Sequence, residues 1–461
     1  MTTPGERPGR TLPPPGLRRP RPLLLAGGCV VTMDPDRRVL PKADLLLSGG
    51  RITAVGERIA LPPGVTTLDC SGCLVLPGFV QAHVHLCQTL ARGRADDAAL
   101  LDWLRGAIWP YEAALDGASA AAAAALGCAE LLLGGTTAIL DMGTVRWQDE
   151  IFSVCERVGL RVTSGKAMMD KGEGVPASLR ERTADSLRDA AALAKRWHGA
   201  AGGRLRYAYA PRFVLSCTEE LLREAAAAAR AGGMLLHTHA SENPEECAAV
   251  RAETGADNVE ALGRLGLLGR DVVLAHGVWL SERERALIAE SETSIVHCPS
   301  ANLKLASGIA PVPELRAAGV RVALGADGAA CNNNLDVFCE MRLSALVHRP
   351  RGGPRALSAR TAVEMATLGG AQALGLEAEI GSLEPGKRAD ACVVEAGGLH
   401  QAPLGPADPY ATLVFASGAR DVRDVVIGGE VVVRDRTLLT LDRHEVLTRA
   451  RAAARRLFGK D

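Results

Sequence analysis

Apolar, β-prone runs alternate with Ala-rich stretches of helical character through the middle of this chain. The predicted strands are Val75–His85, Thr137–Met142, Arg161–Met168, Leu205–Phe213, Met234–His239, Val272–His276, Ser294–His297 and Val320–Gly325. The helical stretches between them include Ala118–Leu133, Thr218–Ala231 and Glu282–Glu290. Eight such β/α alternations predict an α/β protein built on a distorted TIM-type (β/α)8 barrel, with a doubly wound open sheet as the alternative.

Short β-like runs punctuated by Gly and Pro flank this region on both sides. They are Leu23–Met33, Ala43–Val55 and Thr66–Leu76 before it, and Ala391–Glu395, Val422–Ile427 and Glu430–Arg434 after it, with a hairpin signal at Gly428-Gly429. We therefore expect residues 23–75 and 378–440 to form one small, β-sandwich-like domain. The barrel would then occupy residues 76–377, and a C-terminal helix residues 441–461. Residues 1–22, with seven prolines and five arginines, are expected to form a disordered leader.

Composition narrows the class of protein. Hydrophobic residues make up 47% of the 461 residues, which is enough for a large core. Lys plus Arg and Asp plus Glu are 53 each, so no global field attracts nucleic acid or an anionic membrane. The 12 cysteines are scattered, with the only C-x-x-C at Cys70–Cys73, which favours reduced thiols and the cytoplasm. No apolar run approaches the length of a membrane span, and no signal-peptide core follows the basic N-terminus.

Histidines and one aspartate stand where the predicted strands end. His83 and His85 are one residue apart, and because side chains alternate along a strand they point the same way. The others, at the ends of later runs, are His237, His239, His276 and Asp327. A barrel brings these ends to one face. Neutral imidazoles with one carboxylate suit one divalent ion, Zn²⁺ or else Fe²⁺, better than a hard cation.

A hydrolytic metal site also needs a group that moves protons close to the attacking water. Glu242 is the candidate, because it follows just after His239 in the segment His239-Ala240-Ser241-Glu242. The residues around it also have the composition of a helix N-terminus, and both interpretations can hold together.

Several motifs, in order along the chain, resemble those of the amidohydrolase superfamily. They are Leu76-Pro77-Gly78-Phe79 before the H-x-H, His237–Glu242, Val272–His276, His297–Gly308 and Leu324–Asn334. The similarity is to the branch that holds triazine chlorohydrolases and purine-type deaminases, and it runs over nearly all of residues 23–450. Deaminases of this branch hydrolyse the exocyclic C–N bond of cyclic amidines.

The resemblance implies a site with one metal ion, bound by His83, His85, His239 and Asp327. It also implies that His276 bonds to the water at the metal and that Glu242 passes a proton to a ring nitrogen. Asp327 would accept the water's proton and deliver it to the departing ammonia. From alternation alone His237 stays open as a ligand, because it shares a strand face with His239. Lys166 is the candidate for the carboxylated lysine of a two-metal site, with a substrate-facing or ion-paired lysine as the favoured interpretation.

The substrate is less defined. The chain resembles most the deaminases of S-adenosylhomocysteine, 5'-methylthioadenosine and 5'-deoxyadenosine, through the Asp327 loop and through Trp109-Pro110-Tyr111-Glu112. The resemblance implies that Glu112 holds the ribose 2' and 3' hydroxyls, although an acid at a helix start is also favoured by the helix dipole. Cys331 stands where relatives often carry a serine near the purine N7, and Asn302 follows an alanine where relatives carry serine. The segment Ser164–Met169 lacks the arginine of homocysteine-accepting relatives, which favours a small 5' group.

Guanine deaminase is the competing interpretation. Ala210–Cys217, with Arg212, resembles the segment of that enzyme that holds the base, and Gln88 matches its H-x-x-Gln. Triazine dechlorination and a scaffold that has lost its metal are further alternatives, but the proposed ligands and Glu242 are all present here. The expected partner is a small purine nucleoside or base, with no nucleic acid and no membrane. Relatives of this kind often form homo-oligomers, so a dimer or tetramer is expected.

Overall fold

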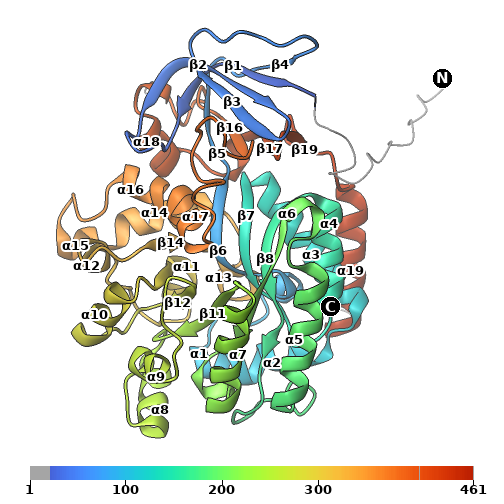
Figure 1. The fold of residues 1–461 in the computed structure, drawn as a ribbon, viewed down its shortest axis with the longest axis vertical. Helices are drawn as coiled ribbons and strands as arrows, with labels where there is room; N and C mark the ends of the chain where they lie inside the picture. Colours follow the sequence, from blue (N-terminus) through green and yellow to red (C-terminus); the bar gives the residue numbers. More distant parts are fainter. Residues whose placement is uncertain (1–20, 404, 460–461) are drawn as a thin grey trace.

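The computed structural model describes residues 21–403 and 405–459. The predicted leader therefore lies almost entirely outside the described residues. Figure 1 shows a curled parallel sheet wrapped by helices, with a second sheet packed at one end of it.

The curled sheet follows the order β14-β13-β12-β11-β10-β8-β7-β6-β15, with β9 paired to β10, and its neighbouring strands are parallel. Its strands are β6 (Phe79–His85), β7 (Thr136–Met142), β8 (Arg161–Gly165), β9 (Ala167–Met168), β10 (Leu205–Pro211), β11 (Leu235–Ala240), β12 (Val272–His276), β13 (Ser294–His297), β14 (Val322–Leu324) and β15 (Asp327–Gly328). Because β15 follows directly after β14 and pairs with β6, the curled sheet returns to its first strand. The fold is TIM-barrel-like, and every residue of β6, β7 and β12 is buried, as expected for strands covered on both faces.

Three predicted strands are interrupted in the structure. The run Val75–His85 is two strands in two different sheets, because the chain turns at Gly78. The run Arg161–Met168 breaks at Lys166, and the last predicted strand continues past its expected end as β15. The break between β14 and β15 is followed by Asp327, the first residue of β15, whose φ of 61° lies in the left-handed region. Periodicity alone does not show such breaks, since the residues on both sides are equally apolar.

The second sheet has the order β19-β18-β17-β16-β5-β1-β2-β3, with β4 paired to β1. Its strands are β1 (Leu23–Val31), β2 (Val39–Ser48), β3 (Arg51–Gly56), β4 (Thr66–Asp69), β5 (Cys73–Pro77), β16 (Ala391–Glu395), β17 (Val422–Ile427), β18 (Glu430–Arg434) and β19 (Thr437–Leu438). The antiparallel pair β5–β16 joins the two flanking segments of the chain. The predicted hairpin at Gly428-Gly429 is confirmed, because Ile427 pairs with Glu430 across it.

Helices surround the curled sheet and fill its connections (Figure 1). The longer ones are α3 (Gly117–Leu133), α4 (Gln148–Val158), α5 (Thr183–Trp197), α7 (Glu219–Ala231), α8 (Pro244–Thr254), α9 (Asn258–Arg264), α10 (Glu282–Glu290), α14 (Val337–Val347) and α19 (Arg443–Phe458). The short ones are α1 (Leu100–Trp103), α2 (Trp109–Ala114), α6 (Ala200–Gly203), α11 (Pro299–Lys304), α12 (Val312–Ala317), α13 (Ala329–Asn332), α15 (Arg349–Gly352), α16 (Ala359–Glu364), α17 (Gly370–Ala373) and α18 (Pro409–Ala411). Single turns of 3₁₀ or π geometry are η1 (Leu86–Ala91), η2 (Leu104–Ile108), η3 (Val214–Ser216), η4 (Met365–Gly369), η5 (Gly405–Ala407), η6 (Thr412–Ala416) and η7 (Ala419–Asp421).

Local capping explains where the long helices begin. The Asp116 carboxylate accepts from Ser119 N at the start of α3, and the Thr218 hydroxyl accepts from Leu221 N at the start of α7. The terminal helix α19 packs along α3, as Figure 1 shows at the side of the molecule.

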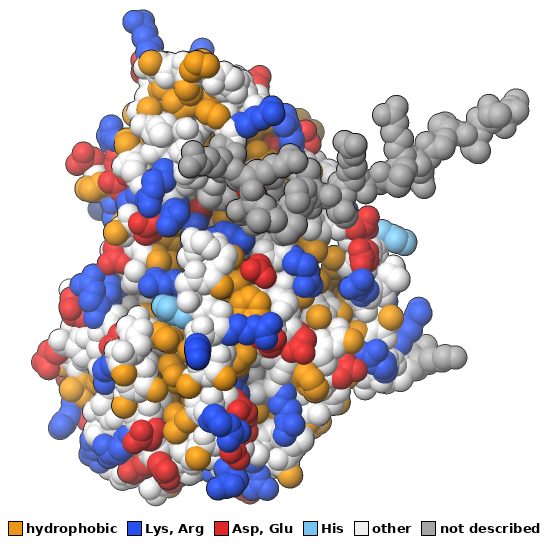
Figure 2. Space-filling view, turned by 45° about the vertical axis from the view of Figure 1, so that its right-hand side comes forward, with side chains coloured by type: hydrophobic (Ala, Val, Ile, Leu, Met, Phe, Trp, Pro, Cys, Tyr) orange, Lys and Arg blue, Asp and Glu red, His pale blue; other side chains and the backbone are white. Residues whose placement is uncertain are grey.

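Charges of both signs are mixed over the surface. On the face shown in Figure 2, Lys and Arg side chains alternate with Asp and Glu, in line with equal totals of 53 each. Among the described residues no single helix is long and apolar enough to cross a membrane. One pair, Leu100–Ala114 with Gly117–Leu133, meets that test together by length and composition, but it is bent by 112°.

Candidate metal centre and active site

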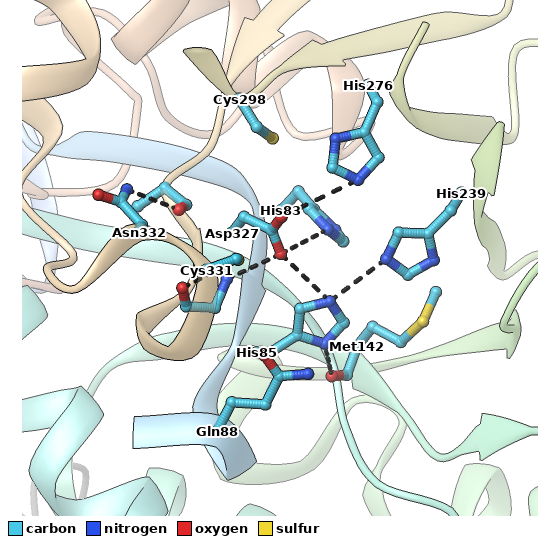
Figure 3. A network of polar contacts seen from close by, with 12 residues as sticks. His83, His85, Gln88, Met142, His239, His276, Cys298, Asp327, Cys331 and Asn332 are labelled. Atoms are coloured by element: carbon cyan, nitrogen blue, oxygen red, sulfur yellow. Dashed lines mark hydrogen bonds and ion pairs between the residues drawn. The ribbon is translucent and has the colours of Figure 1, made fainter. Parts of the chain in front are cut away.

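Four histidines and Asp327 converge where β6, β11 and β12 end and β15 begins (Figure 3). Asp327 Oδ1 lies 3.3 Å from both His83 Nε2 and His85 Nε2, and His85 Nε2 lies 3.3 Å from His239 Nε2. Two overlapping groups have all their ligand atoms within 4.8 Å of one another: His83, His85 and His239 in one, and His83, His276 and Asp327 in the other.

The outer nitrogen of each imidazole is held by a hydrogen bond. His85 Nδ1 lies 2.8 Å from the Met142 carbonyl oxygen, and His239 Nδ1 lies 2.8 Å from the Arg212 carbonyl oxygen. A carbonyl only accepts, so each Nδ1 carries the proton and each Nε2 presents a lone pair. His276 Nδ1 lies 2.9 Å from Asn302 Oδ1 in the same manner.

The donor set fits a metal ion. The Nε2 atoms of His83 and His276 are buried and have no hydrogen-bond partner among the described residues. Burial lowers the pKa of His83 to about 4, and it also lowers the pKa of His239 and of His276. Burial thus favours the neutral form of these three imidazoles, which is the form that binds a metal ion. Burial alone would raise the pKa of Asp327, but the neighbouring histidines, His83 first among them, hold it well below its ordinary value.

His237 and Lys166 lie outside this cluster. His237 Nε2 contacts His83 Nδ1 at 2.9 Å, so His237 stands behind a member of the cluster. Lys166 Nζ lies 2.5 Å from the Glu181 carboxylate and 3.5 Å from Ser186 Oγ, on the α5 side of the strand. Lys166 therefore forms an ion pair with Glu181, which is one of the two interpretations favoured from the sequence.

Glu242 reaches the cluster from the turn after β11. Its Oε2 lies 3.4 Å from His276 Nε2. Ser241, with φ at 54°, forms the turn, and its carbonyl oxygen accepts from Val278 N and Trp279 N at 2.8 and 2.9 Å. Burial, and next the charge of Asp327, raises the pKa of Glu242 well above its ordinary value. The expected helix start is present as well, since Asn243 caps α8.

Sequence reasoning missed Glu246. Its Oε2 accepts from Glu242 N at 2.9 Å, and the side chain also lines the cavity above the cluster. Burial raises its pKa to about 7. The signal was in the sequence, because Asn243 followed by Glu246 has the spacing of a capping box.

A cavity opens above the cluster between β11 and the residues that precede α2. It is lined by His85, Gln88, Leu100, Trp103, Leu104, Arg212, Phe213, His239, Glu242, Glu246, His276, Leu305 and Asp327. Leu100, Trp103, Leu104 and Leu305 were not anticipated, because their apolar positions look like ordinary core.

The expected substrate contacts divide into two sets. Gln88 and Arg212 line the cavity. Trp109, Glu112, Asn302 and Cys331 are buried but are not among its lining residues. Asn302 instead holds His276, and Cys331 Sγ contacts the Gly328 carbonyl oxygen at 3.1 Å.

Comparison with known proteins agrees with this geometry. The model of the amidohydrolase family matches residues 74–432, and the chain belongs to that family. A 5-methylthioadenosine/S-adenosylhomocysteine deaminase of Halobacterium salinarum is 42% identical over 439 residues, covering 94% of this chain and 97% of the relative. A 5'-deoxyadenosine deaminase of Methanothermobacter thermautotrophicus is 38% identical over 92% of this chain and 97% of its own length. The crystal structure of an adenosine deaminase from Xanthomonas campestris with bound zinc superposes with a TM-score of 0.89 at 34% identity, over 95% of this chain and 99% of that one.

Proposed function

We propose that this protein is a metal-dependent deaminase of adenosine-type nucleosides. Its substrate would be 5'-deoxyadenosine, 5'-methylthioadenosine or S-adenosylhomocysteine, and its products the inosine-type nucleoside and ammonia. The observation that carries the proposal is the placement of Glu242 Oε2 at 3.4 Å from His276 Nε2, at the bottom of a cavity above the histidine–aspartate cluster. The substrate class is supported by the two relatives, which are named as a 5-methylthioadenosine/S-adenosylhomocysteine deaminase and a 5'-deoxyadenosine deaminase.

His83, His85, His239 and Asp327 would hold one ion, zinc in our proposal and iron as the alternative. When bound, that ion would supply a nucleophile at neutral pH by lowering the pKa of a water molecule to about 7. Asp327 would accept the proton of the attacking water, and the His276 Nε2 lone pair would orient that water. Glu242, whose pKa is raised by burial, would donate a proton to the ring nitrogen beside the reacting carbon.

For the organisation of the chain we propose a closed (β/α)8 barrel over residues 76–377. Residues 23–75 and 378–440 would form a small, β-sandwich-like domain, and residues 441–461 a terminal helix. The separate buried cluster that includes Leu25, Leu45, Leu47, Ile52 and Val75 supports this division. We further propose a cytoplasmic homo-oligomer, dimer or tetramer, whose partners are small purine compounds rather than nucleic acid or membranes.

Guanine deamination is the second candidate, and the lining of the cavity favours it. Arg212 and Gln88, which resemble the base-holding residues of guanine deaminase, line the cavity, whereas Glu112 does not. If Glu112 does not hold the ribose hydroxyls, one of the reasons for expecting a nucleoside substrate no longer applies.

The direct test is ammonia release by the zinc-loaded protein from 5'-deoxyadenosine, 5'-methylthioadenosine, S-adenosylhomocysteine and guanine, measured side by side. Glu242→Gln serves as the control, because it keeps the shape of the side chain and removes the acid. Turnover of a nucleoside that this control loses by about 10²-fold or more supports the proposal. Turnover of guanine alone would transfer the assignment to the second candidate, and no turnover of any of the four would end both.

A further inference from the structure

Glu340 is a buried carboxylate that the proposed mechanism does not use. It belongs to α14, is 0% exposed and is not among the residues that line the cavity. Its Oε1 accepts from Asn332 Nδ2 at 2.8 Å, and its Oε2 accepts from Ser300 N at 3.2 Å. Burying a carboxylate is costly unless its oxygens accept hydrogen bonds, so these two contacts hold Glu340 in one position.

Asn332 extends this contact to the residue before Asp327. Its Nδ2 also donates to the Ala326 carbonyl oxygen at 2.8 Å, so the two hydrogens of one amide group serve Ala326 and Glu340. The N–H of Ala326 is held as well, because it donates to Gln81 Oε1 at 3.0 Å. The backbone on both sides of Ala326 is thus fixed by side chains that come from other elements.

The peptide group that enters Asp327 decides where the Asp327 carboxylate points. The φ of 61° describes rotation about the N–Cα bond of Asp327, and that nitrogen lies in the same peptide plane as the Ala326 carbonyl group. A left-handed φ is uncommon for residues other than glycine, and it persists only where the surroundings hold it. By holding the Ala326 carbonyl oxygen, Asn332 fixes that plane. It thereby keeps Asp327 Oδ1 at 3.3 Å from His83 Nε2 and from His85 Nε2.

The second oxygen of Glu340 anchors it on the other side of the cluster. Ser300, whose N–H it accepts, lies in the first turn of α11. The same helix carries Asn302, whose Oδ1 lies 2.9 Å from His276 Nδ1. Glu340 therefore connects the backbone before Asp327 with the helix that orients His276.

We propose that Glu340 is a positioning residue, which acts through Asn332 to hold Asp327 in the left-handed conformation that brings its carboxylate to the histidine cluster. Because Glu340 does not line the cavity, it affects the reaction only through the groups that it holds. The inference rests on the proposed function for the reaction that Asp327 serves. Its consequence for metal binding does not depend on the substrate.

The variant Glu340→Gln disrupts this chain of contacts and keeps the size of the side chain. The backbone N–H of Ser300 can only donate, so the glutamine oxygen must face it, and the new NH₂ group must face the NH₂ group of Asn332. Asn332 must then move away or turn its amide, and in both cases it loses the Ala326 carbonyl oxygen. In the Asn332→Ala background the new NH₂ group meets no such donor, so Glu340→Gln should have little effect there.

The experiment is a double-mutant cycle with wild type, Glu340→Gln, Asn332→Ala and the double variant. Two readouts need no substrate: zinc affinity, measured by competition with a chelator, and the visible absorption spectrum of the cobalt-loaded protein. We expect zinc affinity to fall by about tenfold or more in each single variant, with a changed cobalt spectrum, because the Asp327 carboxylate is displaced. The double variant should lose no more than about threefold beyond Asn332→Ala.

Turnover of 5'-deoxyadenosine, with zinc in excess, connects these contacts to the reaction. Glu340→Gln and Asn332→Ala should each lower kcat by about tenfold or more and change KM by less than about threefold, because the cavity lining is unchanged. If the two losses multiply in the double variant, in zinc affinity or in kcat, the two residues act separately and the proposal is overturned. If Glu340→Gln does not fold, wild-type zinc affinity and an unchanged cobalt spectrum in Asn332→Ala would overturn it as well.

Glu284→Gln is the matched control. Glu284 is also a buried glutamate in a helix, its two oxygens accept from Val259 N and Ser281 N at 2.8 Å each, and it does not line the cavity. This variant should lower the unfolding midpoint and leave zinc affinity, the cobalt spectrum and kcat unchanged. If Glu340→Gln behaves in the same way, its role is structural only, and the inference fails even if the wild type deaminates a nucleoside. If the wild type turns over no nucleoside, the proposed function fails, and the two metal readouts still decide the role of Glu340.

Discussion

Each histidine of the cluster presents Nε2 inward because its outer nitrogen is bound elsewhere. The Met142 and Arg212 carbonyl oxygens do this for His85 and His239, and Asn302 does it for His276. Such outer contacts set the tautomer and the ring orientation, and they matter nearly as much as the ligands themselves. Two of these three outer contacts are made by backbone carbonyl groups, which the sequence does not reveal as functional.

Asn302 gives the first prediction at this scale. Asn302→Ala removes the acceptor of His276 Nδ1, so the ring loses its fixed tautomer and orientation. We expect kcat/KM for the best substrate to fall by about 10- to 100-fold while zinc content stays near wild type. Asn334→Ala, in the turn between α13 and α14, is the control, because among the described residues its side chain is bonded only to Asp336 N. Unchanged kinetics in Asn302→Ala would remove His276 from the proposed mechanism.

Glu246 gives a prediction about pH. Burial raises its pKa from 4.5 to about 7, so the folded protein binds this proton more tightly than the unfolded chain does. Its contribution to stability is therefore most favourable below pH 4.5 and becomes less favourable as the pH rises to about 7. Glu246→Gln lacks this dependence. Asn258 can reverse its amide to pair with the new glutamine, because Asn258 Oδ1 has no hydrogen-bond partner within residues 21–403 and 405–459.

Urea unfolding of both proteins across this range tests the effect. The unfolding free energy of wild type minus that of Glu246→Gln should fall by roughly 3 kcal/mol from the acidic to the neutral end. A difference that stays constant, or that rises with pH, would show that Glu246 is ionised in the folded protein throughout.

At the scale of elements, the break at Gly78 lets one apolar run serve two sheets. The chain leaves β5 and enters β6 there, and a Cβ at this position would lie 2.1 Å from the Thr137 side chain. Gly78→Ala should therefore destabilise the protein by about 1–3 kcal/mol, through displacement of β7. Thermal unfolding checks this, with Gly56→Ala as control, since a Cβ there meets nothing within 4 Å. Equal midpoints for the two variants would contradict the close approach.

The elements also show how far the sequence could lead. Side chains alternate along a strand, so His83 and His85 lie on the same face. The carboxyl ends of the parallel strands of a barrel lie at one face, so the histidine–aspartate cluster could be predicted from the sequence. The partner of Glu112 could not, because Arg212 lies 100 residues away and no local pattern joins the two. The strand breaks at Gly78 and Lys166 were also missed, because steric crowding from neighbouring strands decides them.

At the scale of the whole molecule, Asp390 joins the two sheets. Its carboxylate accepts from Arg161 Nε and Nη2 at 2.8 and 3.1 Å, and from Gly428 N at 2.7 Å. Its backbone carbonyl oxygen accepts from Gly78 N at 3.2 Å, at the point where the chain passes from one sheet into the other. The small sheet is therefore anchored to the curled sheet through one buried ion pair and the turn beside it.

Asp390→Ala leaves the Arg161 cation buried without its partner, and this should cost about 3–5 kcal/mol of unfolding free energy. Replacing Arg161 with Met in the same protein removes the stranded charge, so the double variant should recover much of the loss. Asp185→Ala, which breaks an exposed pair with Arg188, should cost less than about 1 kcal/mol. Because Asp390 is remote from the cavity, variants that remain folded should keep the wild-type KM. A double variant no more stable than Asp390→Ala would mean that the backbone contacts of this turn, and not the ion pair, hold the two sheets together.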